Sequence, residues 1–123
     1  MHTLFRTWLT ASAMTAALAA PAVAQGAPGF DGSYAGVSRK LVSDTSAHHI
    51  CPPSGGIGVL TIRGGVAQTR WGSGTYDGQV TAQGTLTMRA SNGAHFDGHI
   101  SGNVAQGQSL NGPCTQELTW QKQ

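Results

Sequence analysis

The strongest constraint on the fold is a short pattern that the chain repeats between residues 71 and 110. Residues 76–80, with the sequence YDGQV, correspond to residues 96–100, with the sequence FDGHI, and each run is followed by an Ala-Gln-Gly segment. Apolar and polar side chains alternate in both runs, which is the two-residue period of strands with one buried face. The repeat therefore predicts antiparallel strands in which the even-numbered side chains from Tyr76 through Val104 are buried together.

The turns between these runs set the expected register. Glycine at the end of a three-residue loop predicts hairpins at 82–84, 91–93 and 105–107, and Gly64-Gly65 predicts a two-residue turn of the primed type. The resulting cross-strand pairs are Val80 with Leu86, Met88 with Phe96, Gly102 with Leu110, and Ile62 with Ala67. Other expected strands cover residues 30–39, 57–62, 66–71 and 114–122.

Glycine recurs on the inward face of these strands, at Gly32, Gly36, Gly78, Gly98 and Gly102. A glycine inside a strand costs about 0.5–1 kcal/mol, so its repeated use there needs a reason. Glycine lets a sheet curve tightly while a neighbouring aromatic ring covers the bare backbone. An even number of up-and-down strands then closes, because the first and last strands run antiparallel. The sequence predicts an all-β fold, a small up-and-down antiparallel β-barrel of about eight strands.

The N-terminal residues 1–24 have the features of a cleaved signal peptide. Arg6 precedes an apolar run too short to span a membrane comfortably, and Ala22-Val23-Ala24 matches a small-x-small cleavage site. Residues 25–29 are expected to form a flexible lead, and residues 30–123 a single barrel domain. No cysteine lies at the cleavage point, so no lipid anchor is expected there. We expect a periplasmic or secreted protein without a stable membrane anchor.

The charge of the exported chain excludes one class of partner. Without Arg6, six Lys and Arg residues face five Asp and Glu residues, for a net charge of about +1. Nucleic-acid-binding proteins carry a strong basic patch, and anionic membranes attract polybasic segments. We therefore expect no nucleic acid as a partner, and the oligomeric state is left open.

Cys51 and Cys114 are the only cysteines of the chain, and export permits their oxidation to a disulfide. A crosslink that closes a loop of this length stabilises a protein by about 4 kcal/mol in the chain-entropy model. That is a large part of the 5–15 kcal/mol typical of a domain. The alternative, a redox or metal-binding thiol pair, lacks the C-x-x-C spacing.

Two groups of side chains are candidate metal ligands. His95, Asp97 and His99 project from one face of a predicted strand, as ligands for Zn or Cu would. The alternative is a polar surface ladder, because the expected register places Arg89 opposite His95. The adjacent His48-His49 pair is a weaker candidate, since neighbouring strand residues point in opposite directions and the haem-attachment motif C-x-x-C-H is absent.

Catalysis has little support in the sequence. The repeated Asp-Gly carboxylates are expected on the outer face, without the apolar pocket that would raise the pKa of one of them. No serine lies in a G-x-S-x-G context, and the glycine-rich segments lack phosphate-binding spacing. We therefore expect a non-enzymatic protein that needs no cofactor apart from the Zn or Cu considered above.

The six aromatic side chains that follow the expected signal peptide are all expected inside the barrel. They are Phe30, Tyr34, Trp71, Tyr76, Phe96 and Trp120. One interpretation is a filled hydrophobic core, which a domain of this size needs for stability. The other is a cup at the barrel mouth, in which Tyr34, Trp71, Tyr76 and Trp120 contact a small ligand.

The longest stretch without periodicity covers residues 40–56, and long loops in compact domains are often functional. The leading hypothesis is an exported, soluble, non-enzymatic binding or interaction module that presents this loop, including Asp44, His48 and His49, on a rigid barrel. One alternative is a carrier of a small apolar ligand in the barrel interior. The other is a Zn- or Cu-handling protein that uses His95, Asp97 and His99.

Overall fold

The computed structural model describes residues 28–72 and 74–123, so the expected signal peptide and most of the expected lead lie outside the described residues. A short 3-10 helix, η1 (Pro28–Phe30), precedes eight strands. The strands are β1 (Gly32–Asp44), β2 (Leu60–Arg63), β3 (Val66–Trp71), β4 (Gly74–Val80), β5 (Thr85–Ala90), β6 (His95–Ser101), β7 (Val104–Asn111) and β8 (Cys114–Lys122).

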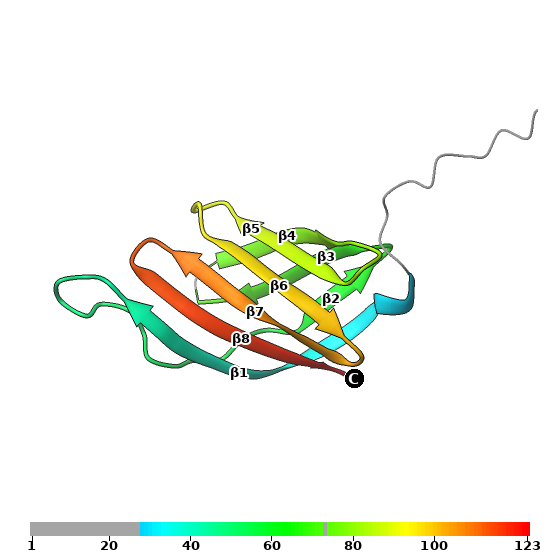
Figure 1. The fold of residues 1–123 in the computed structure, drawn as a ribbon, viewed down its shortest axis with the longest axis horizontal. Coiled ribbons are helices and arrows are strands. Elements are labelled where there is room, and N and C mark those ends of the chain that lie inside the picture. Colours follow the sequence, from blue (N-terminus) through cyan, green and yellow to red (C-terminus); the bar gives the residue numbers. More distant parts are fainter. Residues whose placement is uncertain (1–27, 73) are drawn as a thin grey trace, which may run out of the picture.

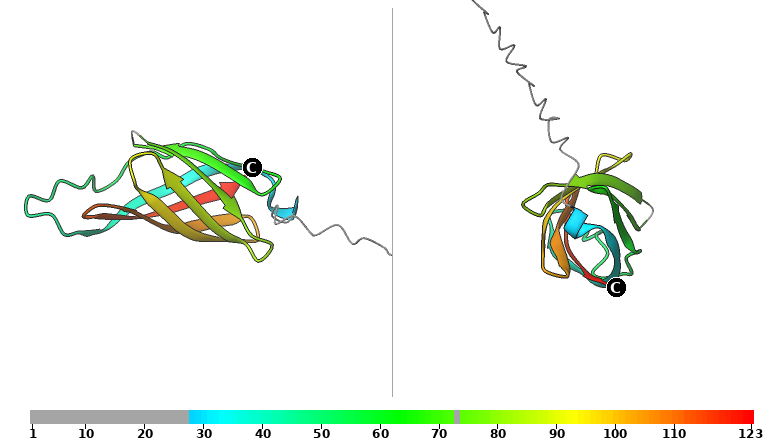
Figure 2. Two further views of the ribbon diagram at one scale, coloured as in Figure 1. Left: turned by 90° about the horizontal axis from the view of Figure 1, so that it is seen from above. Right: turned by 90° about the vertical axis from the view of Figure 1, so that its right-hand side faces the viewer.

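The strands form one closed barrel in which each strand pairs with its neighbours in sequence and β1 pairs with β8 (Figures 1 and 2). All eight pairings are antiparallel. Pairing of the first strand with the last leaves no open edge, which protects a small β protein from edge-to-edge association. The predicted fold class, an eight-stranded up-and-down barrel, is confirmed.

Two of the predicted three-residue hairpins are confirmed together with their register. Val80 pairs with Leu86 across the loop at 82–84, and Met88 pairs with Phe96 across the loop at 91–93. The loops end in Gly84 and Gly93, with φ angles of 86° and 90°. These angles lie in the left-handed region that glycine enters without a steric penalty.

The third predicted hairpin, at 105–107, is wrong. The turn lies at Gly102-Asn103 instead, Gly102 has a φ of 58°, and Ser101 pairs with Val104. Consequently Val104 and Leu110 are each 38% exposed and not buried as expected. The inward residues of β7 are small or polar, so their alternation with the polar outer face carries little signal in the sequence. They are Ala105, Gly107 and Ser109.

β1 departs most from the expected strand at 30–39. Phe30 belongs to η1, and the strand continues through Asp44 along β8, with irregularities between Gly36 and Ser38 and between Leu41 and Ser43. An extra residue in one strand shifts the following side chains to the opposite face. The two-residue period is therefore interrupted, which is why the sequence from residue 40 onward looks aperiodic. The loop that follows covers residues 45–59, not 40–56.

The segment before β2 also differs from the expected strand at 57–62. β2 begins at Leu60, and Ile57 forms only an isolated bridge with Trp71. The Gly58 carbonyl oxygen accepts hydrogen bonds from Trp120 Nε1 at 3.0 Å and from Thr69 Oγ1 at 3.3 Å. Both donors are buried side chains, so this segment turns toward the interior and satisfies their polar groups.

The inward glycines allow the close approach of neighbouring strands that tight curvature requires. Gly98 pairs with Gly107 across β6 and β7, and the ring of Phe96 lies against both. A Cβ atom at Gly98 would be 2.6 Å from the Phe96 ring, and one at Gly107 would be 2.7 Å from it. This is the aromatic cover over bare backbone that the sequence pattern predicts.

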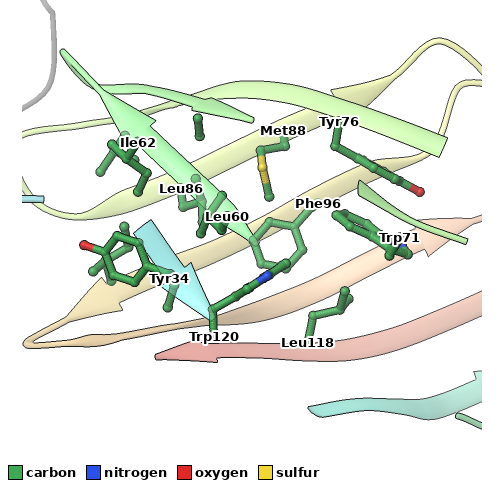
Figure 3. Packing of buried hydrophobic residues seen from close by; sticks show 14 of the residues in the cluster. Tyr34, Leu60, Ile62, Trp71, Tyr76, Leu86, Met88, Phe96, Leu118 and Trp120 are labelled. Atoms are coloured by element: carbon green, nitrogen blue, oxygen red, sulfur yellow. The ribbon is translucent and has the colours of Figure 1, made fainter. Parts of the chain in front are cut away.

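A cluster of buried side chains occupies the barrel interior (Figure 3). Tyr34 and Ile62 lie toward one end of the cluster, and Trp71 and Tyr76 lie toward the other. Five of the six predicted inward aromatic residues are buried, and the sixth, Phe30, is partly buried against the cluster. The interior is therefore a packed core, as a barrel of eight strands permits.

The predicted disulfide is present. Cys51 and Cys114 are bonded, with their Cα atoms 5.5 Å apart. The bond links the loop at 45–59 to the first residue of β8. Among the residues that the structure describes, no helix has the length and apolar character needed to cross a membrane.

Candidate functional site

The two ends of the barrel differ. At one end η1 lies across the opening (Figure 2), with Phe30 packed on the core and its carbonyl oxygen accepting a hydrogen bond from the Tyr34 hydroxyl at 2.7 Å. At the other end the long loop at 45–59 extends beyond the strands (Figure 1). The up-and-down topology places the connection between β3 and β4 and the turns at 91–93 and 112–113 at that same end. We refer to it as the open end.

A pocket of about 270 Å³ lies at the open end. Its lining is contributed by several strands, by the turns between them and by the base of the loop. The lining residues are Arg39, Pro52, Trp71, Gly72, Gly74, Tyr76, Asn92, Ser109, Asn111, Cys114 and Gln116. Polar donors and acceptors thus meet an aromatic wall in one small cavity, so the pocket offers both kinds of contact that ligand sites combine.

Arg39 is the charged residue of this pocket. The first irregularity of β1 turns it inward, because Gly36 pairs with Trp120 whereas Arg39 pairs with Leu118. Its Nε atom donates a hydrogen bond of 2.8 Å to the side-chain oxygen of Gln116. The Gln116 nitrogen in turn donates to the Pro52 carbonyl oxygen at 3.1 Å. Since Gln116 is only 6% exposed, this chain of bonds fixes the guanidinium orientation and ties the loop to the barrel.

Trp71 and Tyr76 form the aromatic wall. Their rings are stacked, with centroids 3.4 Å apart and an interplanar angle of 10°. Burial raises the pKa of the Tyr76 hydroxyl above 10.0, although a hydrogen bond with Ser109 and the charge of Arg39 oppose the shift. The phenol therefore stays protonated at neutral pH and can donate a hydrogen bond toward the pocket.

The loop at 45–59 is organised by Asp44. One carboxylate oxygen accepts hydrogen bonds from the Ser46 amide at 2.9 Å and from the Ser46 hydroxyl, and the other accepts the Cys51 amide at 3.0 Å. The hydrogen bond from the Ser46 hydroxyl is the main cause that lowers the pKa of Asp44, with smaller contributions from these two amides and from His49. The predicted binding residue Asp44 is thus a structural element that fixes the loop.

The tip of the loop is exposed. His48, His49 and Ile50 all face solvent, and Ile50 is 69% exposed. His49 has a φ of 50°, a left-handed conformation that is uncommon for residues other than glycine. The Ile50 amide donates to the Ser46 hydroxyl at 3.1 Å, so the tip is connected to the bonds around Asp44.

The predicted metal ligands lie on the outer face of β6, where the sequence places them. His95 Nε2 and Asp97 Oδ2 are 3.8 Å apart. Arg89 is opposite His95 in the ladder, as predicted. Within residues 28–72 and 74–123, no group of three or more His, Cys, Asp or Glu side chains is arranged to hold a metal ion. The candidate three-ligand centre at His95, Asp97 and His99 is therefore not assembled here, and metal binding by the His48-His49 pair stays a hypothesis.

Sequence reasoning missed most of the polar pocket residues. Gln116 lies two residues after Cys114 on the predicted inward face. A polar residue at such a position indicates a candidate site residue, so the sequence does contain evidence for Gln116. Ser109 was missed because the incorrectly predicted hairpin at 105–107 places Leu110 on the inward face and Ser109 on the outer face. The sequence does not indicate that Arg39 lines a pocket, because a strict two-residue period from Tyr34 places it on the outer face.

Of the predicted ligand-binding aromatics, Trp71 and Tyr76 line the pocket, whereas Tyr34 and Trp120 are fully buried in the core.

The fold and the site together define a closed eight-stranded barrel with one covered end and one open end that carries both a fixed loop and a small polar pocket. Comparison with known proteins found no matching family model, no matching curated protein and no matching solved structure.

Proposed function

We propose that this chain is an exported, non-enzymatic binding protein that recognises a protein partner with the loop at 45–59. The observation that carries the proposal is that the loop combines a fixed base with an exposed apolar tip. The base is held by the Cys51–Cys114 disulfide, by Asp44 and by the bond from Gln116 to Pro52. The tip presents Ile50.

A fixed loop is an effective recognition element because its ordering entropy is lost during folding and not during binding. An exposed isoleucine gains free energy when a partner covers it, at roughly 25 cal/mol per Å² of apolar surface removed from water. The neighbouring His48 and His49 add hydrogen-bonding groups around it. An apolar centre with a polar rim is the usual organisation of a protein–protein interface.

Other observations support the remaining parts of the proposal. The disulfide is consistent with an oxidising compartment outside the cytoplasm. The lining contributed by the described residues contains no His, Asp or Glu, so these residues supply none of the usual pairs of general acid and general base. The packed interior gives no support to a carrier of a bulky apolar ligand.

Site-specific photo-crosslinking tests the proposal. A photoreactive amino acid replaces Ile50 in one variant and Val66, next to the β2–β3 turn, in a control variant. Val66 is also β-branched and is 52% exposed, but it lies far from the loop in the topology. We expect a discrete protein adduct from position 50 and none from position 66 when the exported protein is irradiated in its native compartment.

The Asp44→Ala substitution provides a second control. It removes three hydrogen bonds that hold the loop, and it leaves the strand pairings of the barrel in place. We expect the adduct from position 50 to decrease sharply in this background, while the urea-unfolding midpoint of the barrel changes little. Equal adducts from positions 50 and 66, or none from position 50, would refute recognition through the loop.

A further inference from the structure

The pocket at the open end contains a positive charge that no acid neutralises. Among the described residues that line the pocket, Arg39 is the only one with a charged side chain. Over the two described stretches of chain, the one ion pair joins His95 and Asp97 on the outer face of β6. A half-buried guanidinium without a carboxylate is unusual, because buried charges are normally paired. The missing counterpart is therefore expected to come from a ligand.

The guanidinium is positioned with one end available. Its Nε atom is used by Gln116, and its Nη1 atom reaches the Gly56 carbonyl oxygen only at 3.5 Å. Nη2 lies toward Gly72 at the rim of the pocket, where an added Cβ would be 3.9 Å from it. None of the hydrogen bonds found among the described residues uses Nη2. Nη2 is thus unused and Nη1 carries a second N–H group, so this end of the guanidinium can form the paired hydrogen bonds that carboxylates accept from arginine.

The rest of the lining is suited to a small organic body. Asn92 uses its side-chain oxygen to accept the Ala94 amide at 3.0 Å, which leaves its amide nitrogen as a donor. Asn111 and Ser109 add further polar groups, and Trp71 stacked on Tyr76 supplies a flat apolar wall. The lining therefore offers contacts beyond those that a simple inorganic anion would use.

The volume limits the size of the ligand. About 270 Å³ is just below the range of roughly 300–1,000 Å³ that is typical of pockets for drug-sized molecules. The cavity thus favours a ligand smaller than a typical drug-sized molecule.

From these observations we propose that the pocket is a binding site for a small organic carboxylate, whose carboxylate group pairs with Arg39 and whose body packs on Trp71 and Tyr76. The site is independent of the protein partner proposed above, because it uses residues inside the barrel mouth and not the tip of the loop. Crosslinking at position 50 tests only the partner.

Benzoate and benzamide are a matched pair of probes, because they have the same shape and differ in charge. In an NMR titration of the isotope-labelled exported chain, we expect benzoate to shift the backbone signals of Gly72 and Asn92 and the Arg39 Nε–H signal saturably. Benzamide is expected to bind about tenfold or more weakly, because a hydrogen-bonded charge is lost. This comparison needs no substitution, so it does not depend on the folding of a variant.

Substitutions at two arginines provide a second test of the proposed carboxylate site. Arg39→Gln is expected to weaken benzoate binding about tenfold or more, whereas Arg70→Gln, at an exposed position of β3, is expected to leave it unchanged. Inorganic phosphate is the third probe and is expected to bind more weakly than benzoate, because it lacks a body that packs on the aromatic wall. Equal binding of benzoate and benzamide, equal binding of phosphate, or no saturable shift at the pocket overturns the proposal.

Discussion

Replacing Gly98 by alanine tests whether the curvature of the barrel depends on missing side chains. A Cβ atom at this position would be 2.5 Å from the Gln106 carbonyl oxygen on β7 and 2.6 Å from the Phe96 ring. Ordinary contact begins near 3.4 Å. The added methyl group therefore requires β6 and β7 to separate by about 0.9 Å, and it also requires the Phe96 ring to leave its position over the glycine pair.

The expected loss of unfolding free energy can be estimated from the contacts that the substitution disrupts. Separation of the strands weakens about two ladder hydrogen bonds, each with a net contribution of about 0.5–1.5 kcal/mol. Displacement of the Phe96 ring in a packed core adds about 1 kcal/mol, at the lower end of overpacking effects. The expected loss is about 2–4 kcal/mol of unfolding free energy. For a domain of this size that corresponds to a melting temperature lower by roughly 10–30 °C.

Urea unfolding followed by tryptophan fluorescence measures this loss, since Trp71 and Trp120 are both buried in the core. Gly56→Ala is the matched control, because nothing lies within 4 Å of a Cβ at that position and its φ is not positive. The control is expected to be neutral or slightly stabilising. If Gly98→Ala and Gly56→Ala change the unfolding free energy equally, then the glycine is not there to permit close approach of the strands.

Three further predictions concern the loop and the core. Replacing Cys51 and Cys114 by serine is expected to lower the unfolding free energy by about 4 kcal/mol, because the bond spans 63 residues; a loss below about 1 kcal/mol in urea would contradict this. The pKa of Asp44 is lowered in the folded state, so its contribution is present above the unfolded value near 3.9 and is lost as pH falls through the lower folded value. Hydrogen exchange at the Cys51 amide should show this acid dependence, and Asp44→Asn should abolish it. Burial raises the pKa of both Tyr34 and Tyr76 above 10.0, so tyrosinate absorbance should appear at higher pH in the folded than in the urea-unfolded chain. Stability should fall as pH rises through the folded values, and coincident folded and unfolded titrations would refute the burial of the two hydroxyls.

The regular part of the barrel could be predicted from the sequence for a physical reason. In β4, β5 and β6 most inward positions carry either a large apolar residue or a glycine with an aromatic neighbour, so the two-residue period is strong. Gly84 and Gly93 then restrict the hairpins to one register. Where inward residues are small, as at Ala105 and Ser109, the period is weak and the turn was assigned incorrectly.

The site could be predicted only in part. The disulfide could be predicted because the chain has only two cysteines. The inward position of Trp71 and Tyr76 could be predicted from the alternation of apolar and polar residues along their strands. The role of Asp44 in fixing the loop requires the positions of two backbone amides, which no sequence pattern specifies. Arg39 is the clearest example of a site residue that the sequence could not predict, because its inward orientation depends on one irregularity of the strand pairing near Val37.

That irregularity connects the architecture to both proposed binding sites. In an even-stranded up-and-down barrel the first strand begins and the last strand ends at the same end, which η1 covers here, and the long connection at 45–59 lies at the other end. The extra residue near Val37 turns Arg39 into the mouth of the barrel, and the second irregularity near Val42 lets β1 continue along β8 to Asp44 and Cys114. A regular β1 would place Arg39 in solvent. The two departures from the two-residue period thus bring the anion-binding group and the fixed base of the loop to the same end, which fits the tendency of bulges to occur where a strand must redirect a functional side chain.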